Sequence, residues 1–298
     1  MFLAINEIKH SKLRYTLVIG VMFLISYLVF FLSGLAYGLA QENRMAVDKW
    51  KATDIFLSEK ANDSLNMSMI DSDIASQVKA KEKAVLAQTA GIIYDANNEV
   101  LTIVGFTDSA KFNISPVLYT SLDTFQQIRY GSNSNFQPKT TYNAIVTRGK
   151  ISQQPKGLQK LSISKFIDKL PGYSAQVLTF GFMIGFLVVI AAVVIGIFIY
   201  VLTMQKIAIF GVMKAQGISS RFISKSVIAQ TFILAFSGVL IGLLATLGSA
   251  LILPEAVPFQ TNLLFFGVIT LLMIVVAIVG ALFSVRAIVK IDPLKAIG

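Results

Sequence analysis

The sequence predicts an α-helical membrane protein with four transmembrane helices, one before and three after a small external α+β domain. Hydrophobic residues fill 55% of the 298 positions. Four stretches of 27, 36, 29 and 30 residues contain no charged residue. A bilayer core about 30 Å thick needs roughly 20 apolar residues at 1.5 Å each, so each stretch is long enough to cross it. The predicted spans are residues 15–41, 170–205, 226–254 and 256–285.

The first span follows residues 1–14, which are expected to form an amphipathic N-terminal segment. A cleavable secretory signal has an apolar region of about 7 to 15 residues. The region here has 27 residues. We therefore expect an anchor that stays in the mature protein.

The distribution of basic residues indicates the orientation. Residues 1–14, 206–225 and 286–298 together hold 10 basic and 2 acidic residues in 47 positions. Short loops rich in Lys and Arg stay on the cytoplasmic side, so both termini and the 206–225 loop are predicted to be cytoplasmic. Residues 42–169, with 16 basic and 13 acidic residues, are predicted to lie outside. The net charge of +10 is thus a topology signal, and no nucleic-acid partner is expected.

The 128 residues from 42 to 169 suffice for one small domain. Apolar, β-branched runs at 85–94 and 100–106 flank a polar turn at 95–99, which predicts a hairpin. Further strands are expected at 54–57 and 142–147. Helices are expected at 71–83, 121–130 and 163–170, and the composition of residues 131–138 predicts a loop.

No catalytic or metal site is predicted. The chain has no cysteine, and its one histidine, His10, lies on the predicted cytoplasmic side, so neither a Ser-His-Asp arrangement nor a histidine cluster is available outside. Asp71 and Asp73 are interpreted as a solvated surface, and Met67 and Met69 as packing rather than a soft-metal site. The phosphate-binding pattern GxxxxGK followed by Ser or Thr is absent. We expect a subunit that is not itself an enzyme.

The predicted spans carry hydroxyls and amides but no charged side chain. Ion-coupled carriers and cation channels usually place charged residues in the bilayer, so energy is expected to come from a partner. Small residues four positions apart let helices approach closely. A second copy of the chain is one partner that can fill such a groove. The pairs are Gly34 and Gly38, Gly181 and Gly185, and Gly238 and Gly242.

The cytoplasmic loop 206–225 carries a short amphipathic segment. Gly217 is a stop signal for a helix, and Ser219 or Ser220 can cap the next one. The segment is interpreted either as an interfacial helix or as an apolar knob for a cytoplasmic protein. Its clustered apolar residues are Ile207, Phe210, Val212 and Met213.

Two segments carry a family resemblance. Residues 200–217 read YVLTMQKIAIFGVMKAQG, and residues 291–298 read IDPLKAIG. They resemble the Q-K-I-x-x-x-G-x-x-K-A-x-G signature and the closing D-P-x-x-A-I element of MacB/FtsX-type ABC transporter permeases. The one-plus-three arrangement of spans is similar along the whole chain.

Residues 7–15, 33–39 and 254–259 are most similar to the HrtB-type hemin-export permeases of Gram-positive bacteria. The pattern departs at Glu255, where a neutral residue is expected. The resemblance implies a homodimer in the lipid of a bacterial plasma membrane, bound to two copies of a separate cytoplasmic ATPase that hydrolyses ATP. No covalently bound cofactor is implied, and heme would be the substrate.

The resemblance also implies roles for individual residues. It places the ATPase-coupling element at Ile207, Phe210, Gly211, Met213, Lys214 and Gly217, with a terminal contact at Asp292 and Pro293. Hemin needs an apolar slot and an axial iron ligand, for which Tyr, His or Met serve. The candidates near the predicted outer leaflet are Tyr37, Met45, Tyr173, Met183 and Glu255.

Two other functions stay open at this point. An FtsX-like transmembrane regulator would bind a cell-wall hydrolase through residues 42–169 and transport nothing. An exporter of peptides, lipids or antimicrobials would protect the cell without hemin specificity.

Overall fold

The computed structural model confirms the expected fold class, with four long apolar helices and a small domain of antiparallel strands between the first and the second. The chain divides into two compact units. Unit 1 comprises residues 1–38 and 178–298, and unit 2 comprises residues 39–177. The structure describes residues 12–88, 104–108, 110–112, 115–130, 141–254 and 256–289.

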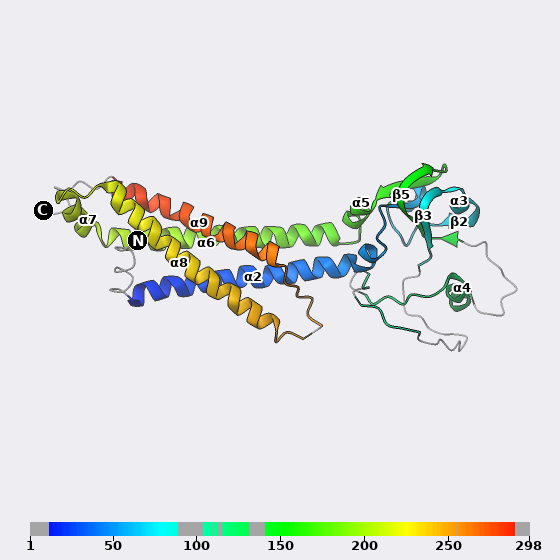
Figure 1. Cartoon of the computed structure of the whole chain (residues 1–298), viewed down its shortest axis with the longest axis horizontal. Helices are drawn as coiled ribbons and strands as arrows, with labels where there is room; N and C mark the ends of the chain where they lie inside the picture. The colour runs from blue at the N-terminus through cyan, green and yellow to red at the C-terminus, as the bar shows by residue number, and fades with distance from the viewer. Residues whose placement is uncertain are drawn as a thin grey trace. The chain divides into compact units, whose positions relative to one another are not determined.

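Four helices in the described part of the chain are long and apolar enough to cross a membrane. Figure 1 shows α8 and α9 as neighbouring antiparallel helices. The helix α9 begins seven residues after the predicted start of the last span, because residues 256–262 form a loop instead. The four helices are α2 (Lys12–Lys49), α6 (Tyr173–Met204), α8 (Ser220–Ala250) and α9 (Leu263–Val289).

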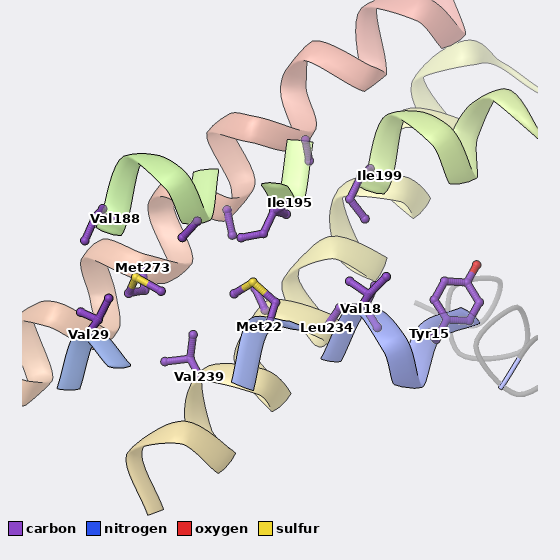
Figure 2. Close-up of a cluster of buried hydrophobic side chains, with 14 of the residues drawn as sticks. Tyr15, Val18, Met22, Val29, Val188, Ile195, Ile199, Leu234, Val239 and Met273 are labelled. Atoms are coloured by element: carbon purple, nitrogen blue, oxygen red, sulfur yellow. The ribbon is translucent and has the colours of Figure 1, made fainter. Parts of the chain in front are cut away.

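The core of unit 1 is a continuous apolar cluster to which all four helices contribute. Figure 2 shows Met22 of α2 and Met273 of α9 among side chains from α6 and α8. Both methionines are 1% exposed. The buried polar side chains described in unit 1 are uncharged, namely Ser26, Ser33, Thr203, Ser224, Ser226, Gln230, Thr231 and Thr246.

Glycines bring α8 against α2. A Cβ on Gly238 would lie 3.2 Å from the Ile19 carbonyl oxygen, and a Cβ on Gly242 would lie 2.9 Å from the Tyr27 nitrogen. The second distance leaves no room for a side chain, and a Cβ on Gly238 would also overlap Met22 Cβ, so this glycine pair packs within one chain. A second close approach, which the sequence analysis missed, joins Gly280 of α9 to α6, where an added Cβ would lie 2.7 Å from the Ala192 oxygen.

Unit 2 is built on a four-stranded antiparallel sheet of order β3-β5-β1-β6. The central strand β1 (Asp54–Ser58) has three consecutive side chains that are 0% exposed, because helices and loops cover both of its faces. A separate pair joins β2 to β4. The remaining elements are η1 (Glu59–Ala61), β2 (Ile70–Asp71), α3 (Ser72–Gln77), β3 (Lys79–Leu86), α4 (Leu122–Tyr130), β4 (Thr141–Tyr142), β5 (Ala144–Gln153), β6 (Leu158–Ser162) and α5 (Ile163–Asp168).

The helix expected at 71–83 is shorter than predicted. It ends at Gln77, and residues 79–86 form β3 instead. The physical reason is that β5 offers this segment a long antiparallel ladder. Lys83, on that strand, also donates to the Ala75 and Val78 carbonyl oxygens at 3.1 Å each.

The predicted hairpin of 85–94 with 100–106 is wrong in its described part. Residues 85 and 86 pair with β5, and residues 104–106 are not in a strand. Residues 85 and 86 thus pair with the distant strand β5 and not with the nearby residues 100–106. Residues 89–103 and the predicted loop at 131–138 lie outside the described residues.

Candidate functional site

The helix α7 (Ile207–Ala215) is held firmly at the end of α6. The Lys206 amide donates to the Thr203 oxygen at 3.0 Å, and the Lys206 carbonyl accepts from the Phe210 amide at 2.9 Å. One residue thus belongs to the hydrogen bonding of both helices. These hydrogen bonds fix the backbone conformation of the turn between the two helices.

The other end of α7 is closed by a glycine. Gly217 has φ +87°, a left-handed conformation that glycine adopts without strain. Its amide donates to the Lys214 oxygen at 3.0 Å, and the Ile218 amide donates to the Met213 oxygen at 2.9 Å, which is the Schellman pattern. The Ser219 hydroxyl then caps α8, as the sequence suggested.

The predicted docking residues of α7 do not share one exposed face. Phe210 is 2% exposed and packs in the core of unit 1, and Gly211 is buried beside it. The apolar side chains that α7 exposes are Ile209, at 58%, and Val212, at 44%. The role of Phe210 and Gly211 in ATPase coupling stays a prediction, and both residues are buried within unit 1. They anchor α7 to its own chain, because helical periodicity turns them inward.

Four side chains tie the turn between α6 and α7 to the start of α2, and we call them the corner clamp. The Arg14 guanidinium donates to Gln205 Oε1 at 2.7 Å. The Lys206 ammonium donates to the Tyr15 hydroxyl at 2.8 Å. Each contact joins residues 191 positions apart, which explains why sequence reasoning assigned no role to them.

The loop between α8 and α9 lies on the glycine face of α2. The Gln260 amide donates to the Gly34 oxygen at 3.2 Å, and the ring centroids of Phe259 and Phe31 are 5.5 Å apart. A Cβ on Gly38 would lie 2.6 Å from the Pro258 carbonyl carbon. The chain itself therefore fills the groove formed by the Gly34 and Gly38 pair.

Tyr37 is held beside this loop. Asn262 donates from Nδ2 to the Tyr37 hydroxyl at 2.9 Å, while its Oδ1 accepts from the Phe265 amide at 3.1 Å. The second bond caps α9 and fixes which amide atom faces Tyr37, since only the nitrogen donates. The rings of Tyr37 and Phe265 stack with centroids 5.9 Å apart.

The other hemin candidates have different surroundings. Tyr173 is half-buried against the core of unit 2 and is a hydrogen-bond partner of Arg44. Met45 is half-buried on α2, and Met183 is 46% exposed on α6. Glu255, Asp292 and Pro293 lie outside the described residues.

A polar pair in unit 2 was missed by the sequence analysis. Asn43, 2% exposed, donates from Nδ2 to Gln176 Oε1 at 2.9 Å. Asn43 Oδ1 and Gln176 Nε2 are buried without a partner. Nearby in sequence, Glu42 is 7% exposed and pairs with Lys111 at 2.5 Å. The signal that could have found this pair is the polar run at 42–44, directly after the uncharged first span.

The chain is similar to known proteins both in its last three long helices and along its full length. Residues 181–293, which contain most of α6, α7, α8 and α9, match the family model of the FtsX-like permease C-terminal region. The chain carries an FtsX-like permease domain. The match includes the glycine-terminated α7 and the turn before it.

The permease is also similar along its full length to proteins named "Putative hemin transport system permease protein HrtB". It is 25% identical to that of Staphylococcus epidermidis strain RP62A, covering 100% of this chain and 99% of the relative. It is 23% identical to that of Staphylococcus haemolyticus, with the same coverage. An uncharacterized ABC transporter permease of Mycobacterium bovis is 24% identical over 72% of this chain and 60% of its own length.

These similarities make the protein an ABC transporter permease, a multi-pass membrane subunit that is not itself the catalyst. Membership of this class implies partnership with an ATPase.

Proposed function

We propose that this permease works as a homodimer with two copies of a separate cytoplasmic ATPase and exports hemin from the plasma membrane. ATP is hydrolysed in the partner, and the movement it produces enters the permease at α7. Both termini and α7 lie on the cytoplasmic side in this proposal. The full-length similarity to the staphylococcal hemin transport permeases supports the substrate.

The observation that carries the coupling proposal is the two-sided character of α7. Phe210 is locked into the core of unit 1 on one side, while Ile209 and Val212 are exposed on the other. A partner that binds Ile209 and Val212 and displaces α7 also displaces the helices of unit 1, because Phe210 is packed among them. The described buried polar side chains of unit 1 carry no charge that could couple transport to an ion.

Coupling is tested with the reconstituted permease and its ATPase. We expect Val212→Glu to leave the permease in the membrane and to lower stimulation of the ATPase at least tenfold, because a carboxylate then enters an apolar docking contact. The control is Ser152→Glu, which places the same charge on an exposed position of β5. Gly211→Glu is a poor test, since Gly211 is buried in the permease itself. If the Val212→Glu permease stimulates the ATPase as well as the wild type does, α7 is not the docking contact.

The hemin proposal rests on chemistry near Tyr37. A tyrosine oxygen is a ligand for heme iron, and the hydrogen bond from Asn262 fixes the position of this hydroxyl. The ring of Phe265 stacks on Tyr37 and supplies an apolar surface next to it. In this proposal heme is the transported substrate and not a resident cofactor.

The hemin proposal is tested by titrating the purified permease with hemin and recording the Soret band. We expect saturable binding by the wild type and at least tenfold weaker binding by Tyr37→Phe, with Tyr173→Phe and Glu255→Gln measured alongside. Tyr27→Phe, on the same helix, serves as the matched control. If the wild type binds hemin no better than an unrelated membrane protein does, hemin is not the substrate. A peptide or lipid exporter then becomes the better description.

A further inference from the structure

We propose that the corner clamp, Arg14, Tyr15, Gln205 and Lys206, transmits movement of α7 to α2 during coupling. These four are positioning residues, because they act through the helices that they join. The inference rests on the proposed docking of an ATPase at α7, and it adds a defined route from α7 to the first helix of the chain.

The clamp joins a rigid point on α2 to a rigid point at the α6–α7 turn. Tyr15 is 1% exposed, and its ring packs in the core of unit 1. Figure 2 shows the ring at one end of the buried cluster with the hydroxyl oxygen directed out of it. A ring fixed on all sides leaves its hydroxyl no freedom to follow Lys206 unless α2 moves as well.

The turn itself cannot absorb a movement of α7. Only Gln205 and Lys206 separate α6 from α7. The Gln205 amide donates to the Val201 oxygen at 3.1 Å, and both backbone groups of Lys206 are bonded within the two helices. Any rotation of α7 therefore displaces the side chains of Gln205 and Lys206, and both of these reach α2.

The bond to Tyr15 is the stronger of the two contacts. Both contacts have a cationic donor, which makes a hydrogen bond about twice as strong as one between neutral groups. The Lys206 to Tyr15 pair is partly buried, so solvent screens it less. The Arg14 to Gln205 pair is exposed, and exposed polar pairs add little to static stability. Breaking the clamp should therefore alter transmission of movement rather than unfold the permease.

The test follows α2 directly and does not depend on the transported substrate. The natural chain has no cysteine, so one cysteine at Leu24, 57% exposed on α2, can carry an environment-sensitive fluorophore. In the complex with the ATPase, we expect ATP to change the fluorescence of the otherwise wild-type protein. With Tyr15→Phe, which keeps the packed ring but removes the hydroxyl, this change should fall at least threefold, while ATPase binding stays within twofold.

The matched control is Tyr27→Phe. It makes the same chemical change on the same helix, where the Tyr27 hydroxyl contacts Ser249 Oγ at 3.0 Å in α8, and it should leave the ATP-dependent signal intact. Lys206→Met removes the other partner and should reproduce the effect of Tyr15→Phe. The exchange Arg14→Gln with Gln205→Arg should restore what either single change loses.

The inference is overturned if Tyr15→Phe and Tyr27→Phe give equal signals, or if the wild type stimulates its ATPase without any ATP-dependent change on α2. Failure of the proposed function gives a different result, namely a wild-type permease that neither binds nor stimulates the ATPase.

Discussion

The contact between the α8–α9 loop and α2 leads to a prediction with a built-in control. Gly38→Ala adds one methyl group to the face of α2 that carries residues 258–260. The added Cβ would lie 2.6 Å from the Pro258 carbonyl carbon and 2.9 Å from the Gln260 nitrogen, and closer still to the Pro258 oxygen. These are backbone atoms, which cannot rotate away as a side chain would. The loop must leave the helix to make room.

The expected cost follows from two opposing effects. Overpacking of a tight contact costs about 1 to 3 kcal/mol, and displacing the loop also breaks the Gln260 to Gly34 hydrogen bond, worth about 1 kcal/mol. Replacing glycine by alanine inside a helix returns roughly 1 kcal/mol. The net destabilisation of unit 1 is therefore about 2 kcal/mol. At Gly181 nothing lies within 4 Å of an added Cβ, so Gly181→Ala should be neutral or stabilising by up to about 1 kcal/mol.

The assay is denaturant-induced unfolding of the purified full chain in detergent, comparing Gly38→Ala with Gly181→Ala and the wild type. Limited proteolysis of the 251–262 loop, which should be cleaved faster only in Gly38→Ala, locates the change. Equal free energies of unfolding for the two variants would refute the packing of the loop on α2. If only Gly181→Ala lowers the free energy of unfolding, the Gly181 and Gly185 pair packs against a second molecule instead.

Two further predictions concern unit 2. Asn143→Ala should destabilise that unit by about 2 to 3 kcal/mol, because a side chain 8% exposed loses two donor bonds and one acceptor bond to the backbone. Hydrogen exchange measured by mass spectrometry checks this, with the exposed Asn66→Ala as control. Met67 and Met69, 71% and 69% exposed, should form sulfoxides in dilute peroxide well before Met22, which is 1% exposed. Peptide mapping reads the order, and earlier oxidation of Met22 would contradict the described core.

The local elements of this protein were predictable where the signal lies within a few neighbouring residues. The strand at 54–57, the helix at 121–130 and the glycine stop at Gly217 are all present. The strand at 79–86 was not predictable, because its partner β5 lies about 65 positions away in the chain. Helical propensity and strand pairing compete there, and the long-range ladder prevails.

Of the candidate site, the sequence predicted a segment of chain but not which of its side chains are buried. The 206–225 loop was recognised as amphipathic and family-like, yet the inward position of Phe210 and the outward position of Ile209 required the packing of unit 1. Tyr37 was proposed from its residue type alone, whereas its fixed partner Asn262 lies 225 positions away.

By itself, the sequence determined that this protein has four stretches long and apolar enough to cross a membrane and one folded domain between the first two, because the absence of charge over a bilayer's length is a property of consecutive residues. Only the tertiary structure decided how the glycine pairs are used, which side of α7 is exposed and how the start of α2 is tied to the turn before α7. The contacts of the Gly34/Gly38 and Gly238/Gly242 pairs and of the corner clamp join residues about 190 to 226 positions apart, and no local pattern encodes which distant backbone or side chain will fill a groove.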